Sequence, residues 1–329
     1  MTDASGRLSS TLTMVAAALL NHHHFREQGA RALCFGTGRH RGATLAHRVE
    51  VAFAQHSKPY WVKLYLVNAA DASKEWRFLN EARERPGDGV GLRMPVPVAH
   101  LDNFAALVTE HVEGEMLSRR IDDVLHGALP DPGLEKATYD GCRMTGKWLA
   151  TLHGRRMAAG LDHPVQALIR DIEARARRAG QVGRISESFA DRVIELACGL
   201  ARQIGPEDLV RVWTHGDYAP FNIILADRAV VALDPSFEES IDCLGNYCSR
   251  YEDLARFCVC IGGSPTDTGT LQRARMLSQF AGGYNGQAER KMDTASAAFA
   301  AFRLKYRLQA LIDWWPAADC EPSELVHGW

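Results

Sequence analysis

The sequence has no apolar run long enough to span a bilayer. The longest run near its start, Leu8 to Leu20, is interrupted by four serine and threonine residues and is shorter than a membrane-crossing helix requires. A secretory signal peptide is the alternative, but Asp3 offsets Arg7 in the preceding residues and no A-x-A cleavage pattern follows. We expect an ordinary amphipathic helix here and no membrane partner.

An excess of charge of either sign is also missing. The 38 lysine and arginine residues nearly cancel the 40 aspartate and glutamate residues, which leaves a net charge of -2. This excludes the whole-chain basic footprint of a nucleic-acid-binding protein. With 46% hydrophobic and 24% charged residues, the composition is that of an ordinary folded protein, and the 329 residues favour two domains.

Several motifs of metal, redox and hydrolytic chemistry are absent. The eight cysteines contain no C-x-x-C pair and no zinc-ribbon spacing. Scattered cysteines in a chain of this size are typical of small buried side chains in a reducing compartment, so we expect a cytoplasmic protein. Neither G-x-S-x-G nor H-E-x-x-H occurs, which argues against the hydrolase and metalloprotease classes.

The chain changes character at the polar stretch 110–114. Before it, the pattern predicts strands at residues 31–35, 49–53, 60–67 and 104–109, a glycine turn at residues 36–38 and a helix at residues 71–85. After it, the pattern predicts helices at residues 138–152, 165–179, 191–203, 270–284 and 295–315, with short strands at residues 210–213, 222–225 and 230–233. We therefore expect a β-rich N-terminal lobe, residues 1–112, and a mainly helical C-terminal lobe, residues 113–329.

Lys63 lies in the middle of the expected strand 60–67. Because side chains alternate along a strand, Lys63 shares a face with Trp61, away from Val62 and Leu64. This places one cation on a face of the sheet that is not occupied by the aliphatic stripe.

The acidic partner of this lysine in the following helix is either Glu75 or Glu81. Glu75 is followed by an apolar stripe that would pack the helix, whereas Glu81 is followed by mostly polar residues and then Pro86. We favour Glu75.

The candidate catalytic residues lie in a loop that reads His215-Gly216-Asp217 and ends at Asn222. An aspartate and an asparagine five residues apart across a tight loop can direct a carboxylate at an acceptor hydroxyl and an amide oxygen at a metal ion. A second acid, Asp234, ends the next short hairpin. This set suits phosphoryl transfer, in which positioning and charge neutralisation by magnesium do most of the catalysis. Taken singly, each would be an ordinary turn residue.

These residues make the chain similar to the aminoglycoside phosphotransferase and choline kinase family, which consists of small-molecule kinases with a protein-kinase-like fold. The loop from His215 to Asn222 matches the family's catalytic loop, which carries His-Gly-Asp where protein kinases have His-Arg-Asp. Leu149 to His153 resembles the family's Leu-x-x-Leu-His helix end. Tyr251 to Ala255 resembles its Tyr-x-Asp-Leu-Ala helix start, although some members have one residue fewer between Tyr and Asp. The resemblance covers about residues 30–257.

The resemblance implies an α/β (α+β) fold with two lobes, an active site between them, and ATP and Mg²⁺ as cofactors. In this interpretation Asp217 orients the acceptor hydroxyl and accepts its proton, and Asn222 and Asp234 hold magnesium. Lys63, paired with Glu75, positions the nucleotide phosphates.

Further nucleotide contacts are implied at three places. Gly36 and Gly38 would form a glycine loop, although this loop does not reproduce the G-x-G-x-x-G pattern. The stretch from Glu110 to Val112 would bind adenine through backbone groups. Trp61 either lies against the adenine ring or is a plain core aromatic.

Two neighbouring residues are expected to have structural roles. His215 would fix the catalytic loop through hydrogen bonds, and Asp253 would cap its helix and brace the same loop. The loop after Asp234 departs from the family pattern, because Pro235-Ser236 stands where an aromatic residue is usual. The long spacing to Asp253 implies an inserted loop around residues 238–248.

The implied activity is ATP-dependent phosphoryl transfer to a hydroxyl of a small molecule such as an aminoglycoside, an aminosugar, an amino alcohol or a sugar. GTP in place of ATP stays open. The alternative is a catalytically silent nucleotide-binding regulator, which the intact set of Lys63, Asp217, Asn222 and Asp234 disfavours. A protein kinase is disfavoured by Gly216 in place of Arg and by the lack of Ala-Pro-Glu after Asp234.

The last seventy residues match no motif of the family. Residues 313–324 combine four acids with the adjacent Trp314 and Trp315. This segment either folds onto the acceptor site and presents carboxylates and ring faces to it, or is a solvated tail with one tryptophan packed against the last helix.

Overall fold

The computed structural model describes residues 2–41, 44–83, 92–127, 129, 131–155, 157–162, 165–227, 229–237, 247–263, 269–315, 322 and 325. The chain divides into two compact units. The first consists of Met1–Pro86 and Arg93–Glu113, and the second of Gly87–Leu92 and Gly114–Trp329. The division between Glu113 and Gly114 falls within the polar stretch at which the sequence changes character.

The first unit is built on a five-stranded antiparallel sheet with the strand order β1-β2-β3-β6-β5. Its strands are β1 (Ala32–Arg41), β2 (Thr44–Ala52), β3 (Ser57–Tyr65), β5 (Pro97–Leu101) and β6 (Ala106–Glu110). The same unit contains the helices α1 (Thr2–Asn21), α2 (His23–Glu27) and α3 (Ala70–Arg83) and the 3-10 turn η1 (Asp102–Phe104). The helix predicted from residues 8–20 is therefore present as part of α1.

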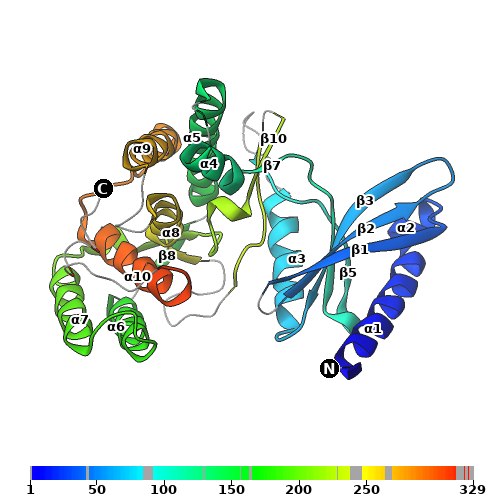
Figure 1. Ribbon diagram of the computed structural model, residues 1–329, viewed down its shortest axis with the longest axis horizontal. Helices are drawn as coiled ribbons and strands as arrows, with labels where there is room; N and C mark the ends of the chain where they lie inside the picture. The colour runs from blue at the N-terminus through cyan, green and yellow to red at the C-terminus, as the bar shows by residue number, and fades with distance from the viewer. Residues whose placement is uncertain are drawn as a thin grey trace. The chain divides into compact units, whose positions relative to one another are not determined.

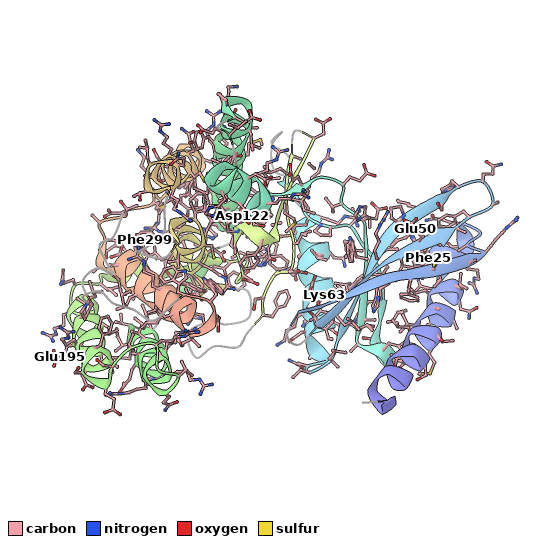
Figure 2. All side chains as sticks on the ribbon, viewed as in Figure 1. Phe25, Glu50, Lys63, Asp122, Glu195 and Phe299 are labelled. Atoms are coloured by element: carbon pink, nitrogen blue, oxygen red, sulfur yellow. The ribbon has the colours of Figure 1, made fainter. Side chains whose placement is uncertain are left out.

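The two faces of this sheet carry different side chains. Val62 and Leu64 of β3 are buried on one face, in a core that includes Val15 of α1 and Phe25 of α2. Lys63 lies on the opposite face, which is covered by α3 (Figure 1), and Figure 2 shows Lys63 and Phe25 on opposite sides of the sheet. The predicted alternation is confirmed as far as Tyr65. The predicted end of the strand is wrong, because β3 ends at Tyr65 and Leu66 and Val67 are exposed.

β1 runs through the glycines that the sequence analysis assigned to a turn. Gly36 and Gly38 lie inside the strand, at an irregularity in its pairing with β2 between Phe35 and Gly38. The prediction of a turn there is wrong, and β2 begins at Thr44, before the predicted start of the strand. The physical reason is packing, because a Cβ at Gly38 would lie 2.5 Å from the buried His47 ring.

The second unit contains the larger share of the helices. These are α4 (Leu117–His126), α5 (Pro132–Arg155), α6 (Val165–Gln181), α7 (Glu187–Ala201), α8 (Arg250–Gly262), α9 (Thr270–Gln287) and α10 (Ala297–Asp313). Figure 1 shows α8 and α10 side by side. Each of the five helices predicted for the C-terminal lobe overlaps one of these, while α4 was not predicted. Within the described part of the chain, no helix has the length and hydropathy of a membrane-crossing segment.

Two small sheets position the loops of this unit. One has the strand order β4-β11-β10-β7, and the other has the order β12-β9-β8. Their strands are β4 (Leu92–Arg93), β7 (Glu115–Met116), β8 (Met157–Asp162), β9 (Val210–Trp213), β10 (Ile223–Ala226), β11 (Ala229–Ala232) and β12 (Tyr247–Ser249). The short 3-10 turns η2 (Pro206–Leu209) and η3 (Pro220–Asn222) precede β9 and β10. Of the predicted inserted loop, Tyr247 and Cys248 belong to β12, and residues 238–246 lie outside the described residues.

Candidate active site

Lys63 is held by an acidic partner within the first unit. Its Nζ lies 2.8 Å from Oε2 of Glu75, and the hydroxyl of Tyr65 donates to the same carboxylate. Both charges are largely buried, since 15% of the Lys63 side chain and 6% of the Glu75 side chain are exposed. The predicted pairing with Glu75 is therefore confirmed. A lysine fixed in this way presents a point charge of the kind that binds phosphate.

Trp61 lies beside the stretch that was predicted to bind adenine. Its indole N–H donates to Nδ1 of His111 at 2.9 Å. Burial lowers the pKa of His111, which keeps the ring neutral and able to accept this bond. Glu110 and Val112, on either side of His111, are half-buried. Adenine binding by Trp61, Glu110 and Val112 stays a prediction.

In the second unit, the loop after β9 holds Asp217 and Asn222 close together. Nδ2 of Asn222 donates to the backbone carbonyl of Asp217 at 3.0 Å, which ties the two ends of the loop to each other. A quarter of the Asp217 side chain is exposed, whereas Asn222 is buried. The loop thus combines a partly accessible carboxylate with a fixed amide.

The side chain of Asp253, on α8, holds this loop by hydrogen bonds. Its carboxylate accepts the backbone N–H of His215 at 2.7 Å and that of Gly216 at 2.8 Å. It also bonds to Nε2 of His153, at 3.1 Å. Burial by itself would raise the pKa of Asp253, but His153, His215 and the backbone donor hold it below its ordinary value. The predicted bracing role is confirmed.

The predicted capping role of Asp253 is wrong. The residue that caps α8 is Ser249, whose side chain accepts the backbone N–H of Tyr251. Asp253 is completely buried in the first turn of the helix and uses both carboxylate oxygens on the catalytic loop instead. A serine directly before a helix is a typical cap, so the sequence contained this signal.

Gly216 brings the catalytic loop against the loop that follows Asp234. Its φ is +81°, a region that L side chains rarely adopt, and a Cβ there would lie 2.5 Å from the carbonyl oxygen of Ser236. The backbone N–H of Ser236 in turn donates to the carbonyl of His215 at 2.9 Å. The glycine that distinguishes this loop from that of protein kinases therefore serves a close backbone approach.

His215 is completely buried and contacts the rings of Trp148 and Tyr218. Burial lowers the pKa of His215 to about 4, although the charges of Asp253 and Asp234 act in the opposite direction. The ring is therefore neutral near pH 7 and serves as a fixed element of the loop, in agreement with the structural role expected for it.

His215 is expected to make folding stability depend on pH. Its pKa is lower in the folded than in the unfolded chain, so its stabilising contribution is complete above about pH 6.5 and is lost as the pH falls toward 4. The loss amounts to roughly 3 kcal/mol, from 1.36 kcal/mol per pKa unit. In urea unfolding between pH 7 and 4, His215→Gln should flatten this fall, while replacing the exposed His126 by Gln should not. Equal slopes for all three proteins would contradict the account.

Asn222 and Asp234 lie at adjoining ends of two paired strands. Ile223 of β10 pairs with Ala232 of β11, and the N–H of Leu233 donates to the carbonyl of Asn222 at 2.7 Å. Asp234 follows with φ at 53°, a left-handed conformation that Asp tolerates better than most residues. Carboxylate and amide oxygens are hard donors of the kind that Mg²⁺ prefers, so the residues present fit the predicted metal.

Arg256 reaches the carboxylate of Asp217 and was not predicted as a site residue. Its guanidinium forms an ion pair with Oδ1 of Asp217. Burial would lower the pKa of Arg256, but the Asp217 carboxylate raises it above its ordinary value. Arg256 follows Asp253 by three residues on α8, so the two share a helix face. This three-residue spacing from Asp253 is the sequence signal that could have indicated Arg256.

Solved structures similar to this chain include two kinases and an antibiotic phosphotransferase. A choline kinase from Cryptosporidium parvum matches with a TM-score of 0.57 and 12% identity, over 95% of this chain and 92% of that one. A spectinomycin phosphotransferase bound to ADP and spectinomycin matches with a TM-score of 0.54 and 13% identity, over 91% and 86%. A glucosamine kinase bound to glucosamine, ADP and phosphate matches with a TM-score of 0.51 and 14% identity, over 84% and 76%. At these identities the likeness establishes the fold, and the predicted protein-kinase-like fold is confirmed.

The fold and the loop His215 to Asn222 thus define a kinase-like phosphotransferase. Residues 46–234, more than half of the chain, match the model of the phosphotransferase enzyme family, and the chain belongs to that family. This membership confirms the predicted enzyme class, a phosphotransferase of the small-molecule kinase type. None of the curated proteins compared with the chain matches it.

Proposed function

We propose that the protein transfers the γ-phosphoryl group of ATP, in the presence of Mg²⁺, to a hydroxyl group of a small molecule. The observation that carries this proposal is the braced catalytic loop, in which Asp217 is partly accessible and Asn222 is tied to its backbone. The Asp253 carboxylate holds the same loop by two backbone hydrogen bonds. Phosphoryl transfer depends chiefly on such positioning.

Asp217 acts on the acceptor. It accepts the proton of the acceptor hydroxyl as that oxygen bonds to the γ-phosphorus and the bond to the β–γ bridging oxygen breaks, which leaves ADP. Asn222 and Asp234 supply the oxygen ligands for Mg²⁺. When bound, the ion neutralises the charge of the β- and γ-phosphates.

Lys63 is proposed to bind the nucleotide phosphates, with Glu75 holding its ammonium in place. Lys63→Met should raise KM for ATP and lower kcat, because the charge acts in both the ground state and the transition state. The lost kcat/KM is expected to be about 10- to 100-fold, from roughly 1.5–3 kcal/mol for a hydrogen bond to a charged group.

The matched control for this variant is Lys74→Met, which removes a lysine of α3 whose partner is Asp71. Steady-state kinetics at varied ATP should leave the Lys74 variant unchanged. If Lys63→Met has the same kinetics as the Lys74 variant, the phosphate contact lies elsewhere.

The acceptor is proposed to carry an amine beside its hydroxyl groups. A small hollow lies next to Arg256 and is lined by Tyr306, Asp313 and Trp314. Arg256, which forms part of its lining, has its charge matched by the Asp217 carboxylate, while Asp313 supplies a further carboxylate and Tyr306 and Trp314 supply aromatic side chains. Carboxylates and aromatic faces attract cationic groups. The similar solved structures include proteins named for choline, spectinomycin and glucosamine, which all contain a nitrogen that is cationic or basic.

The C-terminal segment was predicted either to fold onto the acceptor site or to be a solvated tail with one packed tryptophan, and each of its two tryptophans agrees with a different one of these interpretations. Trp314 is half-exposed and lines the hollow, whereas Trp315 is buried. Of the four acids, Asp313 lies at the hollow, and Asp319, Glu321 and Glu324 lie outside the described residues. The cytoplasmic location and the absence of nucleic-acid and membrane partners stay predictions of the sequence.

The test is an assay of the full chain with Mg²⁺ and either ATP or GTP, using spectinomycin, gentamicin, choline and glucosamine as acceptors. Glucose serves as the matched control for glucosamine, since it differs only in having a hydroxyl where glucosamine has its amine. ADP or GDP release together with a phosphorylated acceptor detected by mass spectrometry supports the proposal, and a preference for glucosamine over glucose supports the amine-bearing class. Nucleotide binding without any phosphorylated product would favour the silent regulator instead.

A further inference from the structure

Arg256 has two neighbours that fix its guanidinium. One is the Asp217 carboxylate, and the other is Tyr306 of α10, whose ring centroid lies 5.3 Å from the guanidinium carbon. The Asp217 and Tyr306 groups both favour the charged form of Arg256 against the effect of burial. The arginine is therefore held between the catalytic loop and α10 rather than extended into solvent.

Tyr306 is itself fixed by a buried set of charges. Its hydroxyl donates to Oε1 of Glu252 at 2.5 Å, and Nζ of Lys305 bonds to both oxygens of the same carboxylate at 2.9 and 3.1 Å. Lys305 also pairs with Asp171 at 3.1 Å, and Asp171 pairs with Arg175 at 2.9 Å. α6, α8 and α10 thus share one polar network.

The charges along this network balance when Asp217 is included. Its three negative charges belong to Asp217, Glu252 and Asp171, and its three positive charges belong to Arg256, Lys305 and Arg175. Removing one partner of a buried pair leaves an uncompensated charge, so such a network resists displacement of any member. Arg256 is consequently a preformed and rigid partner for Asp217.

We propose that Arg256 is a positioning residue that holds the Asp217 carboxylate by Oδ1 and so directs its other oxygen at the acceptor hydroxyl. This inference rests on the proposed function. Because Tyr306 and α10 hold the guanidinium in place, its N–H group meets Oδ1 from a fixed direction, which an ammonium on a flexible stem reproduces less well. A carboxylate that rotates freely spends less time in the orientation that accepts the proton. Poor orientation of a reacting group lowers the rate of the chemical step.

The test compares Arg256→Gln and Arg256→Lys with Arg303→Gln. Arg303 is a buried arginine of α10 whose guanidinium lies over Phe299. For each protein, kcat with the best acceptor is measured together with the dissociation constant for Mg·ATP and the melting temperature. The Arg303 variant reports what the loss of a buried arginine does to folding alone.

The expected order of kcat is wild type, then Lys, then Gln. Arg256→Gln should lose about 10- to 100-fold in kcat, and Arg256→Lys about 3- to 10-fold, with the affinity for Mg·ATP unchanged. Arg303→Gln should lower the melting temperature and leave kcat unchanged. If Arg256→Gln does not fold, the Lys variant alone decides, since a wild-type kcat in that variant contradicts the inference.

Two kinds of failure are distinguishable. A wild-type protein that forms no phosphorylated product contradicts the proposed function, and this inference with it. Wild-type turnover that is matched by the folded Arg256 variants contradicts this inference alone, as does a loss of kcat that the Arg303 variant shows equally.

Discussion

Asp217→Asn is expected to abolish most phosphoryl transfer and to leave nucleotide binding nearly intact. The amide has the same shape as the carboxylate but cannot accept the proton of the acceptor hydroxyl. Positioned proton acceptors contribute about 10²- to 10⁴-fold to the rate, so kcat should fall by that factor. Rapid-mix or steady-state kinetics with a saturating acceptor measure kcat, and calorimetric titration with Mg·ATP measures binding.

Asp227→Asn is the matched control for this prediction. Asp227 is an exposed residue at the turn between β10 and β11, so the same chemical change there should alter neither quantity. A wild-type kcat in Asp217→Asn would refute the assignment of the proton acceptor. A loss of Mg·ATP binding in that variant would show that Asp217 acts on the nucleotide rather than on the acceptor.

Asp234→Ala is expected to weaken nucleotide binding itself, but only when magnesium is present. The variant loses a carboxylate ligand, and contacts to charged groups are worth roughly 1.5–3 kcal/mol, which corresponds to a loss of affinity of at least about tenfold. Calorimetric titration with ATP in magnesium should show this loss, whereas titration in EDTA should give the same affinity for the variant and the wild type. Equal affinities in magnesium would exclude Asp234 as a ligand.

Local patterns were sufficient to predict most of the fold. The alternation of Val62 and Leu64 with Lys63 predicted the face on which Lys63 lies, and helical spacing predicted the long helices of the second unit. The glycine turn was misread because the reason for Gly38 is the His47 ring on the neighbouring strand, which is not visible in the local sequence. A packing contact between strands determines that residue, rather than a turn.

In the site, too, local patterns were predictable and contacts between distant segments were not. Pairing of Lys63 with Glu75 and bracing by Asp253 were predicted, since helix faces and the family motif indicate them. The capping role was misassigned to Asp253 because an acidic residue in a first turn suits a cap as well as a buried brace. Glu252 and Arg256 were not recognised, because their partners, Lys305, Tyr306 and Asp217, come from distant parts of the sequence.

The central claim, transfer of an intact phosphoryl group to an acceptor hydroxyl, is tested most directly with ATP that carries ¹⁸O at the non-bridging oxygens of the γ-phosphate. The full chain is incubated with this nucleotide, Mg²⁺ and the acceptors named above, and the products are weighed by mass spectrometry. The account predicts unlabelled ADP and an acceptor that carries the phosphoryl group with all of its non-bridging label, formed by the wild type and nearly absent with Asp217→Asn. Labelled inorganic phosphate beside unmodified acceptors, or no ADP at all, would contradict it.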